Sequence, residues 1–274
     1  MMKLSWLTKQ NVSRPPRFGR SNPPMYIYLV ISRLRLRPPR NAHMATDSSF
    51  TSFFERWLSR QEAFLRQLET LHRHRECSEI IPQVFSHYQE LYREKSRAAH
   101  ADVFLLLSAP WLTSFERSML WISGFRPSIL FPILVNSVGG ELSAEQRQRI
   151  EAVKAETRRK EREITQAMAR VQETVAEQPL YSLMRKFGKL VDGEVTEFDT
   201  SMDRLKAAML VVVENADALQ GWTAVEVVEI LSPVQGVKFL AAVARFQLQS
   251  RRWGVEKDSE RERMAVDEAL PPPA

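Results

Sequence analysis

Apolar residues recur every three or four positions along most of this chain, a spacing typical of amphipathic helices. The first such pattern begins at Ser52, which is spaced from Glu55 as a capping box that starts a helix. A second helix is expected from Ser78 to about His100. The apolar face of the first helix comprises Phe53, Trp57, Phe64, Leu65, Leu68 and Leu71.

Two tryptophans lie in the stretch from Ala109 to Ser128. Pro110 suits the first turn of a helix, because its φ is fixed and no amide donor is needed there. Gly124 can adopt the left-handed conformation that ends a helix, and Pro127 prevents continuation. The stretch is therefore predicted to form one short helix, closed at both ends, within a core hairpin. Its apolar stripe comprises Leu112, Phe115, Met119 and Ile122.

Residues 143–178 contain no Gly or Pro, and Ser143 and Gln146 are spaced as a capping box. They are predicted to form one helix of roughly 54 Å, at about 1.5 Å per residue. Apolar residues repeat every seven positions, so part of this helix is expected to pack as a coiled coil, inside the chain or across a dimer. The residues predicted to carry self-association in a homodimer are Ile150, Ile164 and Val171.

The region after the long helix continues the helical pattern. Residues 180–193 are predicted to be a linker or a short helix, and 196–219 a longer helix. Thr223, spaced as a capping box with Glu226, is expected to start another. The fold class predicted from these patterns is all-α: a multi-helix bundle with one long central helix and no sheet.

The last helix has the clearest predicted start. Ser232 is placed as its cap, Pro233 at its first position and Gln235 at its third. It is expected to end near Trp253 and Gly254. The segment 258–274 is charged and then Pro-rich, so it is predicted to be a disordered tail.

Composition supports a globular helical protein. The 274 residues are 44% hydrophobic, and nine glycines are few for a turn-rich all-β fold. No apolar run reaches the roughly 18 residues that a membrane helix needs, so no membrane partner is expected. A single cysteine, Cys77, excludes an internal disulfide and is predicted to be an inert structural thiol.

Charge divides the chain near residue 43. Residues 1–43 hold two lysines, seven arginines and no acidic residue, so they carry a charge of +9. Because the whole chain carries +6, the other 231 residues carry −3. The body is therefore not expected to bind nucleic acid by neutralising phosphates. Three interpretations of the basic extension remain open: the functional protein starts at Met44, the extension is an organelle transit peptide, or it is disordered. The predicted domain is 44–257.

No motif for catalysis stands out. The chain lacks a Gly-rich phosphate loop, a dinucleotide fingerprint, HExxH and GxSxG. No nucleophile–base pair or metal constellation is visible, so no catalytic residue, metal site or cofactor is expected.

Several motifs occur together in one order over about residues 50–257. Their residues are Phe50, Phe53, Phe54, Trp57, Gln61, His87, Tyr88, Tyr92, Lys95, Pro110, Trp111, Glu116, Trp121, Ile122, Gly124, Arg126, Pro127, Ser128, Ala216, Asp217, Leu219, Leu231, Pro233, Gln235, Phe239, Leu240, Trp253 and Gly254. Together these motifs resemble the plant delay-of-germination (DOG) domain. The resemblance implies an all-helical regulatory protein without enzyme activity, related to the C-terminal part of TGA-type bZIP transcription factors. Haem binding in the family is associated with two histidines one turn apart in the last helix, where this chain has Gln247 and Arg251, so no haem is expected.

The resemblance implies one of two functions. The first is a protein-interaction module of seed dormancy and abscisic-acid signalling, with type 2C protein phosphatases as partners, in nucleus and cytoplasm. The alternative is a transcription-associated factor that binds DNA sequence-specifically. The first is preferred, because no basic region fused to a leucine zipper is present and no direct specific DNA binding is expected. A transit peptide would instead direct the chain to a plastid or mitochondrion.

The predicted partner surface is the N-terminal helix, through Phe53, Phe54 and Trp57. A helix has one face to bury, and Phe53 and Trp57 suit that face, which leaves Phe54 pointing elsewhere. Exposed aromatic side chains of this kind mark partner grooves. The alternative is that this stripe and that of residues 143–178 are both buried within one bundle.

Overall fold

The computed structural model describes residues 40–71, 77–186 and 188–269, and these residues form helices and no strand. The predicted all-α class is confirmed. Residues 1–39, most of the basic extension, lie outside the described residues. They include Tyr26 to Ile31, whose apolar and aromatic run could form a strand by its sequence. The helices are α2 (Arg40–Leu71), α3 (Cys77–Ala101), α4 (Val103–Ser108), α5 (Ser114–Ser118), α6 (Leu130–Val138), α7 (Ala144–Glu173), α8 (Leu180–Arg185), α9 (Asp192–Ile230) and α10 (Pro233–Ala269), with 3-10 turns η1 (Pro127–Ile129), η2 (Gly139–Glu141) and η3 (Thr174–Ala176).

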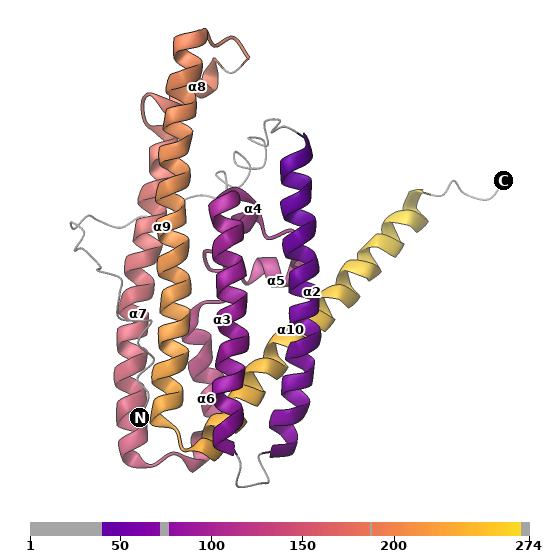
Figure 1. Ribbon diagram of the computed structural model, residues 1–274, viewed down its shortest axis with the longest axis vertical. Helices are drawn as coiled ribbons and strands as arrows, with labels where there is room; N and C mark the ends of the chain where they lie inside the picture. The colour runs from indigo at the N-terminus through magenta and orange to yellow at the C-terminus, as the bar shows by residue number, and fades with distance from the viewer. Residues whose placement is uncertain (1–39, 72–76, 187, 270–274) are drawn as a thin grey trace, which may run out of the picture.

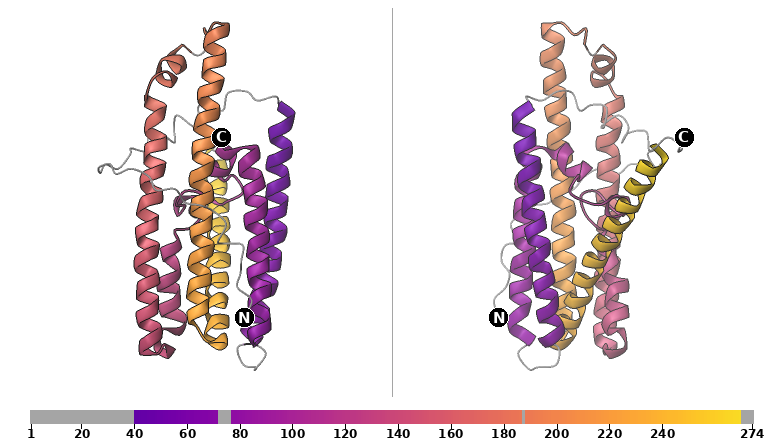
Figure 2. Two further views of the ribbon diagram at one scale, coloured as in Figure 1. Left: turned by 60° about the vertical axis from the view of Figure 1, so that its left-hand side comes forward. Right: turned by 90° about the vertical axis from the view of Figure 1, so that its right-hand side faces the viewer.

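Four helices, α2, α3, α7 and α9, run side by side along the long axis of the molecule (Figures 1 and 2). Helix α10 crosses this bundle obliquely, packs against α2, α3, α5 and α6, and projects beyond it at its C-terminal end. At the opposite side, α8 joins the ends of α7 and α9, which extend past the other helices. The bundle therefore leaves two projections: the α7–α9 end and the end of α10.

Two main apolar clusters form the core. One lies where α10 passes α2, α3, α6 and α9, and it includes the fully buried Phe239 and Leu134. The other joins the first half of α2 to α3, α4 and α9, around Trp57 and Met209. A smaller cluster packs Trp121 against α9. Burial of side chains on this scale is the main source of stability in a helical bundle.

Local capping signals located two helix starts correctly. Ser143 and Gln146 form the capping box that begins α7. At α10, the Ser232 amide donates to Gln235 Oε1 (2.9 Å) and the Gln235 amide to Ser232 Oγ (3.3 Å). Each box satisfies amide groups that a helix start leaves without partners, and it does so within four residues of sequence.

Other predicted helix boundaries are wrong. Helix α2 begins at Arg40 and continues through Ser52, so the Ser52–Glu55 spacing does not start a helix. Residues 192–230 form one helix, within which the Thr223 hydroxyl donates to the Leu219 carbonyl, so Thr223 does not cap a new helix. Helix α10 extends to Ala269, past the point where the disordered tail was expected to begin.

The tryptophan stretch also differs from the prediction. Its helical part is only α5, capped by Thr113, and the left-handed residue that follows is Ile122 (φ 61°), not Gly124. The Trp121 amide donates to the Gly124 carbonyl at 2.7 Å, which closes a tight turn. A Cβ at Gly124 would lie 2.6 Å from Gln220 Nε2, so the Gln220 amide, which donates to the Phe125 carbonyl, would have to move.

Candidate protein-interaction site

The aromatic residues predicted to bind a partner lie mostly in the core. Trp57 is fully buried: its ring stacks on His87 (centroids 4.5 Å apart) and its Nε1 donates to the His87 carbonyl (3.0 Å). Phe54 is only 6% exposed and stacks between Phe50 and Trp57, whereas Phe53 is half-buried. The expectation that Phe54 points away from the core is wrong, because α2 is covered by α3 on one side and by α10 on another.

The residues predicted to carry self-association face the chain's own bundle. Ile150 is buried in the core cluster around α10, and Ile164 packs beside Trp121 against α9. Val171 packs against the cluster around Trp57 and Met209. Helix α7 lies along α9 over much of its length, so this stripe is covered from within the molecule. Self-association through these residues stays a prediction.

The residues named from the family motif play structural parts in the turn region. Trp111 and Trp121 are buried, and Trp121 Nε1 donates to Thr165 Oγ1 on α7 (2.9 Å). The exposed Arg126 lies over the Trp121 ring at 5.8 Å, and the buried Pro127 begins η1. Trp253 is different: it is 47% exposed on α10 and touches Phe115 edge-on (4.3 Å).

A buried ion pair holds the turn against the bundle. Lys95 Nζ on α3 lies 2.5 Å from Asp217 Oδ1 on α9 and donates to Ser123 Oγ in the turn (3.1 Å). Burial raises the pKa of the Asp217 carboxyl, while the Lys95 ammonium and the Ser123 hydroxyl oppose that rise. Gln220, one turn further along α9, donates to the Phe125 carbonyl (2.5 Å). Three segments distant in sequence thus meet at one polar cluster.

A second buried carboxylate joins α5 to α10. Glu116 is nearly inaccessible, and its Oε2 accepts bonds from the Thr113 amide (2.9 Å) and hydroxyl (2.8 Å). Arg251 Nη1 donates to the same oxygen (3.1 Å) and to the Trp111 carbonyl (2.7 Å). The capping box of a five-residue helix therefore fixes the position of an arginine on α10.

A third cluster occupies the interior between α2, α3 and α10. The Gln61 amide donates to the Tyr88 hydroxyl (2.6 Å) and to Gln247 Oε1 (3.3 Å). The Tyr88 hydroxyl donates to the same Gln247 oxygen (3.2 Å). Gln247 and Arg251, the two residues at the positions that the family resemblance associates with haem, are thus both engaged in hydrogen bonds of the bundle.

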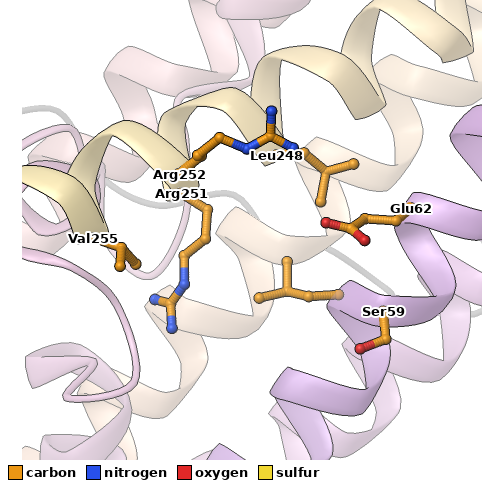
Figure 3. Close-up of a pocket in the computed structure, with 7 residues that line it drawn as sticks. Ser59, Glu62, Leu248, Arg251, Arg252 and Val255 are labelled. Carbon is orange, nitrogen blue, oxygen red and sulfur yellow. The ribbon is translucent and has the colours of Figure 1, made fainter.

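A groove between α2 and α10 is a surface feature of the described residues that suits a partner. It has a volume of about 290 Å³, and four of its residues follow one face of α10 at the spacing i, i+3, i+4 and i+7. Figure 3 shows these side chains opposite those from α2. The lining residues are Leu58, Ser59 and Glu62 from α2, and Leu248, Arg251, Arg252 and Val255 from α10.

Sequence reasoning missed the groove and the pairings beneath it. Lys95, Asp217 and Glu116 stood in the motif, but nothing local indicated that Lys95 and Asp217, 122 positions apart, would pair. Leu248, Arg251, Arg252 and Val255 share a helical face, a signal that was available, although the sequence did not show that this face is left partly uncovered. Among the described residues, no cluster of His, Cys, Asp or Glu could hold a metal ion, and no helix is long and apolar enough to span a membrane.

Fold and surface together define an all-helical bundle with buried polar cross-links and a groove along its last helix. The family model of seed dormancy control matches residues 60–136. Protein ZW2 of Arabidopsis thaliana is 35% identical over 222 residues, 77% of this chain and 98% of that protein. Protein RESPONSE TO ABA AND SALT 1 of the same plant is 36% identical over 230 residues, 79% of this chain and 98% of that protein. The chain therefore belongs to the seed dormancy control family.

Transcription factors share the domain. Transcription factor TGA1 of Arabidopsis thaliana is 32% identical over 204 residues, which cover 73% of this chain and 53% of that factor. The likeness to the transcription factor thus concerns about half of its length. The resemblance inferred from the motifs, to the DOG domain and to part of the TGA factors, is confirmed.

Proposed function

We propose that this chain is a non-enzymatic regulatory protein of abscisic-acid-linked signalling that acts as a helical protein-interaction module, with a type 2C protein phosphatase as its partner. The names of its full-length relatives support the signalling context, since one includes a response to ABA and salt. The nucleus and cytoplasm are the proposed locations.

The observation that carries the interaction role is the partly uncovered face of α10 at this groove, where Arg252 and Val255 are exposed. Val255 is 47% exposed and continues the apolar floor made by Leu58 and Leu248. Amphipathic peptides bind grooves of this kind through side chains at helical spacing. Because Phe54 and Trp57 are core residues, we locate the proposed partner surface at the α2–α10 groove. Phe53 is half-buried on α2 and does not line this groove.

The test is capture of phosphatases from seed extract by the purified full chain. Wild type is compared with Val255→Asp in the groove and with Val211→Asp, a 56% exposed valine on α9 that serves as the matched control. We expect the wild type and Val211→Asp to retain a type 2C phosphatase and Val255→Asp to lose it, with circular dichroism and melting unchanged. Failure of the wild type to retain any phosphatase would contradict the proposed partner. Equal retention by all three proteins would support the phosphatase as partner but would show that the groove is not its binding surface.

A second candidate function is a role in transcription, favoured by the match to TGA1 over 73% of this chain. In that case the chain acts in the nucleus through the shared helical domain. The tagged full chain should then accumulate in nuclei and associate with promoters only when a DNA-binding partner is present. Promoter association that persists without such a partner would instead indicate direct DNA binding.

A further inference from the structure

The two walls of the α2–α10 groove carry opposite charges. Glu62 stands on the α2 wall, and Arg251 and Arg252 stand on the α10 wall (Figure 3). Among the described residues, neither Glu62 nor Arg252 has an ion-pair partner. Both are exposed, so their charges are available to an incoming molecule. The apolar floor lies between them.

Arg251 is held in place before anything binds. Its Nη1 is fixed by the buried Glu116 and by the Trp111 carbonyl, and its guanidinium lies 5.9 Å from the centre of the Phe54 ring. Those two hydrogen bonds use one nitrogen of a planar group with five N–H donors. The remaining donors of an immobilised guanidinium bind a carboxylate with a small loss of side-chain entropy. Arg252 beside it is exposed and adds a second positive charge to this wall.

The size of the groove limits what can occupy it. About 290 Å³ lies at the lower end of the roughly 300–1,000 Å³ typical of small-molecule pockets. This volume suits one or two apolar side chains of a peptide, not a large planar cofactor. The C-terminal end of α10 projects beyond the bundle, which leaves this part of the helix open to a partner segment (Figure 1).

We propose that the α2–α10 groove docks an amphipathic peptide helix of a partner protein, which inserts an apolar side chain between Leu58, Leu248 and Val255. The helix places a carboxylate against Arg251 and Arg252 and a basic side chain against Glu62. Opposite charges on the two walls set the direction in which the peptide lies, because a reversed peptide would bring like charges together. This inference rests on the proposed function and adds the chemistry of the partner segment.

The test uses a random 12-residue phage-displayed peptide library selected on the full chain. Selected clones should share an apolar anchor with an acidic residue on one side and a basic residue on the other. Synthetic peptides of these clones are then titrated by fluorescence anisotropy. We expect Arg252→Glu to weaken binding about tenfold and Glu62→Lys to weaken it several-fold. Arg158→Glu on α7 and Glu197→Lys on α9, both exposed and outside the groove, are matched controls and should change affinity less than twofold.

A charge-reversal cycle decides whether the contacts are direct. Replacing the acidic residue of the peptide by lysine should restore most of the affinity for Arg252→Glu and lower it for the wild type. Several outcomes would overturn the proposal: no enriched clones, clones without the charge pair, equal losses in the control variants, or no recovery in the cycle. Binding only of phosphorylated peptides, or of phosphatidylserine vesicles in their place, would also overturn it. If the phosphatase is captured by wild type and by Arg252→Glu alike, the proposed function stands and this inference fails.

Discussion

Lys95 and Asp217 form an ion pair across the interior, with Nζ 2.5 Å from Oδ1 and both side chains nearly inaccessible. The pair joins α3 to α9 and, through Ser123, fixes the turn that contains Trp121. The net stabilisation from a buried pair is small, but loss of one partner is costly because the other charge stays buried.

Lys95→Met is therefore expected to lower the free energy of unfolding by about 3–5 kcal/mol at pH 7. Burial already raises the pKa of Asp217, and loss of the Lys95 ammonium removes the main opposing effect. A carboxyl with a raised folded-state pKa binds more protons in the folded state, so stability falls as pH rises above its unfolded pKa. The deficit of Lys95→Met should thus shrink between pH 7 and pH 4.5, as measured by urea denaturation.

The control for this pair is Lys186→Met, which breaks the exposed Lys186–Glu194 pair. Exposed pairs contribute at most about 1 kcal/mol, so this variant should remain close to wild type. An equally small loss of unfolding free energy in Lys95→Met would show that leaving Asp217 without its buried partner costs little stability.

His87 should make the protein sensitive to mild acid. Burial, followed by the nearby Arg60 charge, lowers the pKa of His87 to about 4. A depressed folded-state pKa means that the unfolded state takes up the proton first, so stability is lost as pH falls from about 6.5 towards 4. The loss should approach about 3 kcal/mol. The His87→Phe variant keeps a ring beside Trp57, and its denaturation should not show this loss of stability at low pH. The His100→Gln variant, changed at an exposed site, should still show it.

Any side chain at Gly254 on α10 is expected to lower the stability of the fold. A Cβ at this position would lie 2.1 Å from Thr113 Oγ1 and 2.7 Å from Thr113 Cβ. Gly254→Ala should lower the free energy of unfolding by about 1–3 kcal/mol, because α10 must shift away from α5. Gly193→Ala on α9, where no atom lies within 4 Å of the new Cβ, should be neutral or slightly stabilising. Equal effects in thermal melting would show that the close approach is not required.

The full chain is expected not to bind a TGA-box duplex specifically. Its basic excess is in residues 1–43, and the rest carries net negative charge. Any binding should be nonspecific and should fall steeply with salt, because it depends on counterion release. Gel-shift titration measures the affinity for the TGA-box duplex relative to that for a scrambled duplex. A sequence preference that survives physiological salt would contradict this prediction.

Haem is expected not to be retained. The nearest counterparts of the family's haem histidines are Gln247, bonded to Gln61 and Tyr88, and Arg251, bonded to Glu116. Neither side chain is a good ligand for haem iron. Absorbance of haem-loaded protein after desalting should show no Soret band. A persistent band would indicate that another residue binds the iron.

Met44 was predicted to begin the functional protein, and it lies within α2 as the structure describes it. The start site stays a prediction. N-terminal sequencing of the native protein should identify a terminus at or near Met44. An intact Met1 end on the nuclear or cytosolic protein would contradict it.

The sequence by itself determined the all-helical class and the starts of α7 and α10. Those features depend on apolar periodicity and on capping bonds between residues three positions apart, such as Ser143 with Gln146. Burial of Phe54, in contrast, was decided by tertiary structure, because the periodicity of α2 does not say how many of its sides neighbouring helices cover. The turn after α5 was also decided by tertiary structure: Ile122, not Gly124, adopts the left-handed conformation there, and Gln220 from α9 bonds to the Phe125 carbonyl. The Lys95–Asp217 pair and the groove between α2 and α10 likewise join positions far apart in the chain, so only the folded arrangement of the helices brings them together.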